Sequence, residues 1–126
     1  MGIFSRIFSK SAPPQKVEHA VIVEFRYGST DLQPIFAIEQ RLEAAIAAAQ
    51  AGELDGNEVA ADGSDGSLYM YGPNGDTLFA TVKPVLESCS FMRGARVRVR
   101  YGTAGTGVLE AQHVIGGDNK NGDVSL

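Results

Sequence analysis

A four-residue stretch, FRYG at residues 25–28, decides the fold because the chain repeats it as YMYG at residues 69–72. Each copy ends a β-rich run and precedes a helical segment. Those two segments begin alike, with IFA at 35–37 and LFA at 78–80. A third echo, VRYG at 99–102, ends another strand-like run. The repetition predicts two strand–helix halves folded over one sheet.

Alternation of residue types over 17–27 predicts the first strand. One face carries Val21, Val23, Phe25 and Tyr27, and the other carries Ala20, Ile22, Glu24 and Arg26. Apolar residues on both faces indicate a strand in the centre of a sheet. A helix follows at about 32–50, with Asp31 placed to cap it and Pro34 in its first turn.

An acidic, glycine-rich segment separates the first helix from the second half of the chain. Its carboxylates are Glu53, Asp55, Glu58, Asp62 and Asp65. We expect a short edge strand at about 54–61, a turn at 62–66 and a hairpin into a strand at 67–71. The carboxylates could ligate calcium or magnesium, but their spacing matches no EF-hand loop. A solvated edge strand, or a surface for a basic partner, is therefore the favoured interpretation.

A second helix is predicted after the turn at 72–76, with Asn74 or Asp76 as its cap. Its buried stripe comprises Leu78, Phe79, Val82, Val85, Leu86 and Cys89. Pro84 lies inside this helix, where it removes a hydrogen bond and clashes with the preceding turn. We therefore expect a kink or a break near Lys83.

Two further strands close the pattern. The clearest spans 95–101, where Val97, Val99 and Tyr101 alternate with Arg96, Arg98 and Arg100. Residues 108–115 can return as another strand, with Leu109, Ala111 and Ile115 on its apolar face.

The predicted element order is β-α-β-β-α-β with an extra C-terminal edge strand, which predicts a ferredoxin-like α+β fold. Right-handed crossovers place both helices on one face of an antiparallel sheet. We expect the strands that end at Tyr27 and Tyr71 to run parallel and adjacent at the centre, which would bring the two tyrosines together at one end of the sheet.

Length, net charge, composition and cysteine count limit the class of protein to which this chain can belong. The chain has 126 residues, a net charge of −4, 44% hydrophobic residues and a single cysteine, Cys89. These values are typical of one globular domain, here placed at 17–115, and they weigh against a dedicated nucleic-acid binder. One cysteine permits no disulfide within the chain and fits a reducing compartment, so we expect a cytoplasmic protein.

The terminal segments differ from the domain. Ile3, Phe4, Ile7 and Phe8 repeat at helical spacing before a proline-rich linker, which sets residues 1–16 apart. Residues 3–8 could make weak contact with a membrane surface or a partner, or the segment is a frayed or packed terminus. The tail at 116–126 has little to bury, and we expect it to be disordered.

Residues 53–102 resemble a set of small bacterial proteins of unknown function. The matching motifs are ELDGNE at 53–58, LYMYGP at 68–73, VKPVLE at 82–87 and VRYG at 99–102. The resemblance extends back through the first strand and helix and implies the same α+β fold. It implies no activity, substrate or catalytic residue.

The sheet face away from the helices is the first candidate site. Arg96, Arg98 and Arg100 share it with Glu24 and Arg26, and with one of Tyr69 or Met70. Arginines with an aromatic residue on an open sheet are typical of single-stranded RNA binding. The alternative is cross-strand pairing, with Glu24 beside Arg98, and a face that is solvated or used in a dimer.

Catalytic chemistry has weaker support. His19 and His113 have no Ser, Cys or Asp at a spacing that defines a nucleophile site. Tyr27 and Tyr71, if adjacent, could line a ligand pocket of a small enzyme, although core tyrosines are commoner. We therefore expect a non-enzymatic interaction or regulatory domain that binds protein partners or forms a homodimer, with no metal or cofactor.

Overall fold

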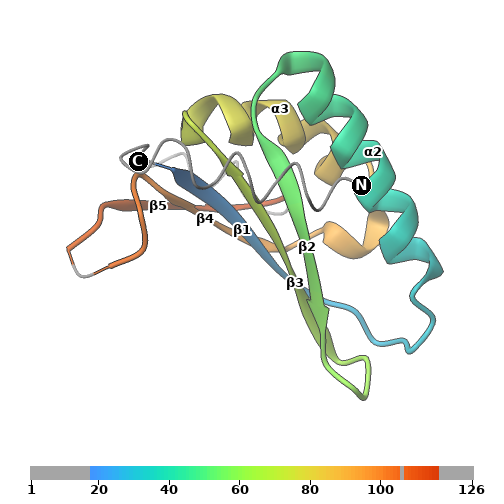
Figure 1. Ribbon diagram of the computed structural model, residues 1–126. Coiled ribbons are helices and arrows are strands. Elements are labelled where there is room, and N and C mark those ends of the chain that lie inside the picture. Colours follow the sequence, from blue (N-terminus) through green and yellow to red (C-terminus); the bar gives the residue numbers. More distant parts are fainter. Residues whose placement is uncertain (1–17, 106, 117–126) are drawn as a thin grey trace, which may run out of the picture.

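The computed structural model describes residues 18–105 and 107–116 (Figure 1). Its elements, in chain order, are β1 (His19–Arg26), α2 (Gln33–Ala49), β2 (Glu53–Val59), β3 (Asp65–Gly72), α3 (Gly75–Glu87), the 3₁₀ turn η1 (Ser90–Met92), β4 (Arg96–Arg100) and β5 (Glu110–Val114). The strands form one antiparallel sheet in the order β2-β3-β1-β4-β5. Both helices pack on the same face of this sheet.

This arrangement is the ferredoxin-like α+β fold with an extra edge strand, as the element order predicted. Each strand–helix–strand unit leaves a gap that a strand of the other half fills. β3 lies between β1 and β2, and β1 lies between β3 and β4.

The prediction that Tyr27 and Tyr71 meet is wrong. β1 and β3 are adjacent, but they run antiparallel, and their register pairs Ala20 with Tyr71 and Arg26 with Asp65. Tyr27 therefore lies beside Ser64, at the opposite end of the sheet. The reason is the tight hairpin between β2 and β3, which reverses the chain once before β3 reaches β1. Tyr71 instead shares its end of the sheet with Arg100 and Tyr101.

The core fills the space between the sheet and the two helices. Its fully buried side chains include Ile35, Ile38, Leu42, Ile46, Leu68, Met70, Leu78, Leu86, Met92 and Ile115. The first apolar residue of each repeated helix start is fully buried, since Ile35 in α2 and Leu78 in α3 are both 0% exposed. Phe79, Val85 and Cys89 are only partly buried against this core.

The predicted cap of α3, Asn74, is confirmed, whereas α2 has Leu32 at its N-cap position with no side-chain capping bond, and the predicted cap Asp31 lies one residue earlier. Asp31 Oδ1 accepts a hydrogen bond from the Gln33 amide at 3.0 Å, and Asn74 Oδ1 accepts one from the Thr77 amide at 3.1 Å. A kink or a break was expected near Lys83; a break does not occur, because α3 is continuous across Pro84. Pro84 has no N–H to donate to the Ala80 carbonyl, and the helix ends at Glu87, within one turn of it.

The C-terminal strand is shorter than predicted, and one of its apolar assignments is wrong. Ile115 is buried at 1% exposure, but Leu109, which precedes the strand, is 76% exposed. The expected amphipathic segment at 1–16 and all but the first residue of the expected tail at 116–126 lie outside the described residues.

Candidate functional site

The open face of the sheet, opposite the helices, gathers the predicted site residues. Residues that pair directly across antiparallel strands share a face, so the register defines this surface. It comprises Glu53 and Glu58 of β2, Asp65, Ser67, Tyr69 and Tyr71 of β3, Ala20, Ile22, Glu24 and Arg26 of β1, Arg96, Arg98 and Arg100 of β4, and Glu110, Gln112 and Val114 of β5. We call it the open face.

Two apolar residues at its centre are buried although neither of the two helices in the described residues lies above them. Ala20 is 0% exposed and Ile22 is 6% exposed. Ile22 lies between Tyr69 on β3 and Arg98 on β4. Ala20 lies between Tyr71 and Arg100 in the same way. The large flanking side chains therefore form a raised rim around an apolar floor.

The tyrosine pair on β3 is the feature that sequence reasoning missed. Tyr69 and Tyr71 both project from the open face, because Leu68 and Met70 point into the core at 0% exposure. The Tyr69 hydroxyl donates to Glu58 Oε1 at 2.9 Å. That hydrogen bond, ahead of partial burial, raises the pKa of Tyr69. The alternation of residues 67–72 indicates that both tyrosines face outward if Leu68 and Met70 are assigned to the core.

The arginines of β4 are held by carboxylates on both sides. Glu24 lies 3.7 Å from Arg96 Nη2 and 3.5 Å from Arg98 Nη2, and Glu110 lies 3.7 Å from Arg98 Nη1. Arg100 Nε donates to the Gly102 carbonyl at 2.8 Å. The predicted pairing of Glu24 with Arg98 is thus confirmed. These pairs fix the orientation of the guanidinium groups and leave part of each exposed to solvent.

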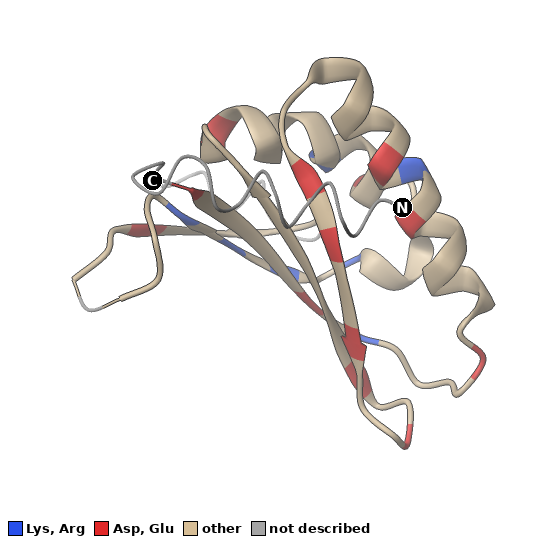
Figure 2. Ribbon diagram, in the orientation of Figure 1, with Lys and Arg blue, Asp and Glu red and all other residues tan. Residues whose placement is uncertain are grey.

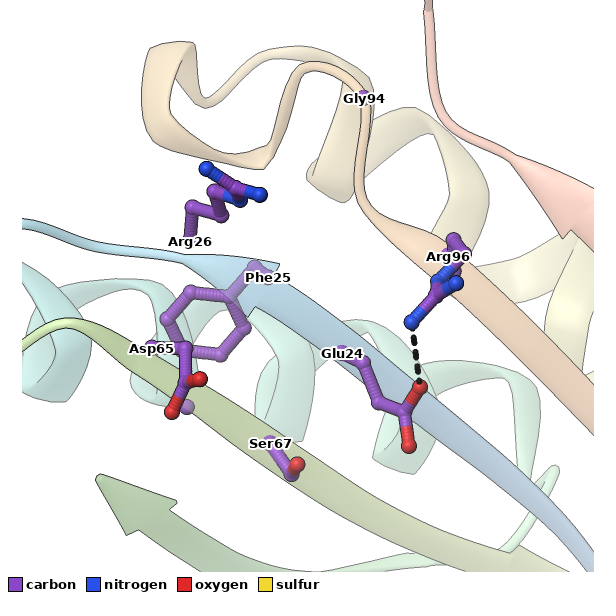
Figure 3. Close-up of a pocket in the computed structure, with 8 residues that line it drawn as sticks. Glu24, Phe25, Arg26, Asp65, Ser67, Gly94 and Arg96 are labelled. Carbon is purple, nitrogen blue, oxygen red and sulfur yellow. Dashed lines mark ion pairs between the residues drawn. The ribbon is translucent and has the colours of Figure 1, made fainter. Parts of the chain in front are cut away.

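A hollow of about 580 Å³ occupies the end of the open face where β1 ends and β3 begins. Figure 3 shows Arg26, Asp65, Ser67 and the Glu24–Arg96 ion pair around it. Arg26 and Asp65 are opposite each other in the register of β1 and β3. The hollow therefore presents charges of both signs, and it suits a charged side chain or a zwitterionic group better than an apolar ligand.

Charge on the open face is divided between its two sides. Figure 2 shows the basic residues along β4 and the acidic residues along β2. The carboxylates of Glu24, Glu53, Glu58, Asp65 and Glu110 outnumber the guanidinium groups of Arg26, Arg96, Arg98 and Arg100. The face is thus polarised across the strands without being basic as a whole.

Tyr27 belongs to a separate aromatic cluster near η1. Its ring lies 5.1 Å from the ring of Phe91 and 6.2 Å from that of Phe25, measured between centroids. Its hydroxyl donates to the Asp31 carbonyl. Partial burial, with the nearby Asp31 carboxylate, raises the pKa of Tyr27. These contacts tie the β1–α2 loop to the core, which is a structural role.

The two histidines both contact α3, although they are far apart in sequence. His19 Nδ1 accepts a hydrogen bond from the Gly75 amide at 2.8 Å, at the start of the helix. The His113 ring stacks on Phe79, with 4.4 Å between centroids. Beside them, the Tyr101 hydroxyl donates to Asp76 Oδ1 at 2.6 Å, and this bond is the main cause that raises the pKa of Tyr101. Each contact anchors the helix to the sheet.

Within residues 18–105 and 107–116, no three potential metal ligands lie close enough together to hold an ion. None of the helices in that part of the chain has the length and apolar character needed to cross a bilayer.

Comparison with protein-family models, with curated proteins and with solved structures finds no match to this chain. The resemblance of residues 53–102 to small bacterial proteins therefore stays a prediction.

Proposed function

We propose that this chain is a non-enzymatic interaction or regulatory domain that binds other protein chains, and that the open face is its binding surface. A partner protein would pack across the tyrosines of β3 and the arginines of β4. A second copy of the chain is a further partner of the same kind.

One observation carries the proposal: a sheet face that no helix of the described residues covers has a buried apolar floor, Ala20 and Ile22, enclosed by tyrosine and arginine side chains. Tyrosine and arginine are enriched among the residues that dominate protein–protein binding energy. Their ion pairs and hydrogen bonds hold them in place before binding, which reduces the entropy lost on association.

The division of charge supports a protein partner over a polyanion. A partner with acidic residues opposite β4 and basic residues opposite β2 would be complementary across the whole face. The hollow at Glu24, Arg26, Asp65 and Arg96 would accept one of its charged side chains.

Single-stranded RNA is the second candidate, and the tyrosine pair favours it. Tyr69 and Tyr71 project from one strand of an open sheet, as the base-stacking aromatics of RNA-binding sheets do. The surplus of carboxylates on the same face opposes it, because RNA binding depends on neutralising phosphates. The third candidate, an enzyme with a pocket between Tyr27 and Tyr71, is not proposed further, because those residues lie at opposite ends of the sheet.

The proposal includes a cytoplasmic location in a bacterial cell, on the basis of the composition, the single cysteine and the resemblance noted above.

The test compares variants in capture of proteins from a native lysate. Tyr71→Ser and Arg96→Glu change exposed parts of the open face, whereas Lys83→Glu makes the same change of charge on α3, on the helix side of the sheet. We expect the first two variants to lose a protein that the wild type and Lys83→Glu both retain. Equal capture by all four chains, or captured material that ribonuclease removes, would contradict the proposal.

A further inference from the structure

The two edges of the sheet are built differently. β2, at one edge, carries Glu53, Asp55 and Glu58 and has a register shift between Leu54 and Gly56. Acidic residues and bulges are common devices that prevent an edge strand from pairing with another chain. β5, at the other edge, pairs with β4 without any register shift and has a single carboxylate, that of Glu110.

The β5 edge is also exposed. Val114 is 47% exposed and Leu109, just before the strand, is 76% exposed. Among the described residues, no strand lies beyond β5 in the sheet order. An accessible, regular edge with apolar residues at both ends is a site where another strand can add.

The hydrogen-bond pattern shows which backbone groups β5 presents. The Tyr101 amide bonds to the Leu109 carbonyl, and the Ile115 amide bonds to the Ala95 carbonyl, so odd-numbered residues of this segment face β4. Hydrogen-bonded and non-bonded positions alternate along an antiparallel pair. The amide and carbonyl groups of Glu110, Gln112 and Val114 therefore point away from β4, towards the free edge.

We propose that β5 pairs antiparallel with β5 of a second copy of this chain, about a two-fold axis that passes between the two Gln112 residues.

The register of that pairing is self-complementary. With Gln112 opposite Gln112 of the second copy, Glu110 is opposite Val114 in both directions, and no two like charges are directly opposite. Arg96, which pairs with Val114 on β4 and is 72% exposed in its side chain, lies next along the same row. Its guanidinium group can therefore approach Glu110 of the second copy. The same axis applied to β2 would bring two acidic edges together.

The dimer would join two sheets into one and leave both open faces on the same side. It does not cover Tyr69 or Tyr71, which lie on β3, three strands away from the edge. This inference is therefore separate from the proposed function: a partner could fail to bind the open face while β5 still pairs, and the reverse.

Opposite charges placed at Val114 test the register. Val114→Glu faces Arg96 within its own chain, so it should not lower the stability of the folded monomer, but it faces Glu110 of the second copy. The dimer contains this pair twice, and we expect the dissociation constant to rise roughly tenfold. Val114→Lys should lower it. Sedimentation velocity of the full chain over a wide range of concentrations measures both.

A proline substitution tests the backbone. The Gln112 amide points away from β4, so Gln112→Pro should keep the fold, checked by circular dichroism, and lose the dimer. Gln112→Thr, which keeps the amide, should remain dimeric. A wild-type chain that is monomeric throughout the concentration range would overturn the proposal. A dimer that Val114→Glu and Gln112→Pro leave unchanged would also overturn it, and would place the second copy elsewhere.

Discussion

The ring of His113 stacks on the ring of Phe79, with 4.4 Å between their centroids and 24° between their planes. This contact joins the last strand of the sheet to α3. It places a titratable group of β5 against the helix layer, with Lys83 and Asp76 as the charged groups that influence it.

Lowering the pH should reduce the free energy of unfolding, because His113 makes this contact in its neutral form. Burial, and then the positive charge of Lys83, lower the pKa of His113, while Asp76 opposes them. The unfolded chain therefore binds more protons than the folded chain between the lowered pKa and the usual value of about 6.5. The stabilising contribution of neutral His113 is present in full above about pH 6.5 and is lost as the pH falls through the lowered pKa. In urea unfolding at a series of pH values, the free energy of unfolding should decrease less with falling pH for His113→Gln than for the wild type. Equal decreases in the two chains would contradict a role for His113.

The open face should behave as part of the core at Ile22. Because this side chain is 6% exposed, Ile22→Ala should cost about 2–5 kcal/mol of unfolding free energy. Val114→Ala, at an exposed position of the same face, should change it by less than about 0.5 kcal/mol. Denaturant unfolding measures both. A cost below about 1 kcal/mol for Ile22→Ala would mean that the rim of tyrosine and arginine does not shield the floor.

The loop between β1 and α2 should depend on close contact at Gly63. Gly28 and Gly63 both have positive φ, at 81° and 75°, but a Cβ on Gly63 would collide with the Ser29 carbonyl, whereas one on Gly28 would meet no atom within 4 Å. Gly28→Ala should therefore cost only the left-handed backbone penalty of about 1–2 kcal/mol. Gly63→Ala adds the steric strain and should cost about 2–5 kcal/mol in sum. Similar midpoints for the two variants would show that the loop adjusts freely.

The bond between Tyr101 and Asp76 should be visible in a tyrosine titration. The Asp76 carboxylate accepts from the neutral phenol, and this raises the pKa of Tyr101 above its ordinary value. Asp76→Asn should lower that pKa, as followed by NMR of chains with labelled tyrosine. An unchanged Tyr101 titration would show that the bond does not form in solution.

Local patterns were enough to predict most of the fold. Strict alternation in β4 placed Val97 and Val99 in the core and its arginines outside, and Asn74 capped α3 where its side chain type indicated. The element order then fixed the architecture, because few connections of such elements are right-handed and unknotted.

The candidate site was predicted only in part, for two physical reasons. Strand direction depends on the whole path of the chain, so the ends at which Tyr27 and Tyr71 lie could not be deduced from their similar local motifs. Residues 67–72 also contain apolar or aromatic side chains on both faces, so alternation alone did not decide whether Tyr69 or Met70 points outward.

The repeated glycines illustrate the same limit. Gly28 has a positive φ in an open turn, whereas Gly72 is extended and packs against the Ala51 carbonyl, a contact made by a distant segment. The same motif therefore serves two different purposes in the two halves.

A photo-crosslinking amino acid at position 71 tests whether the open face binds another protein. Position 36 provides the control, because Phe36 is an aromatic residue, 43% exposed, on α2 on the opposite side of the sheet. In native lysate, we expect a crosslinked protein from position 71 and none from position 36. A crosslink from position 36 alone, or adducts from position 71 that contain RNA and no protein, would contradict it.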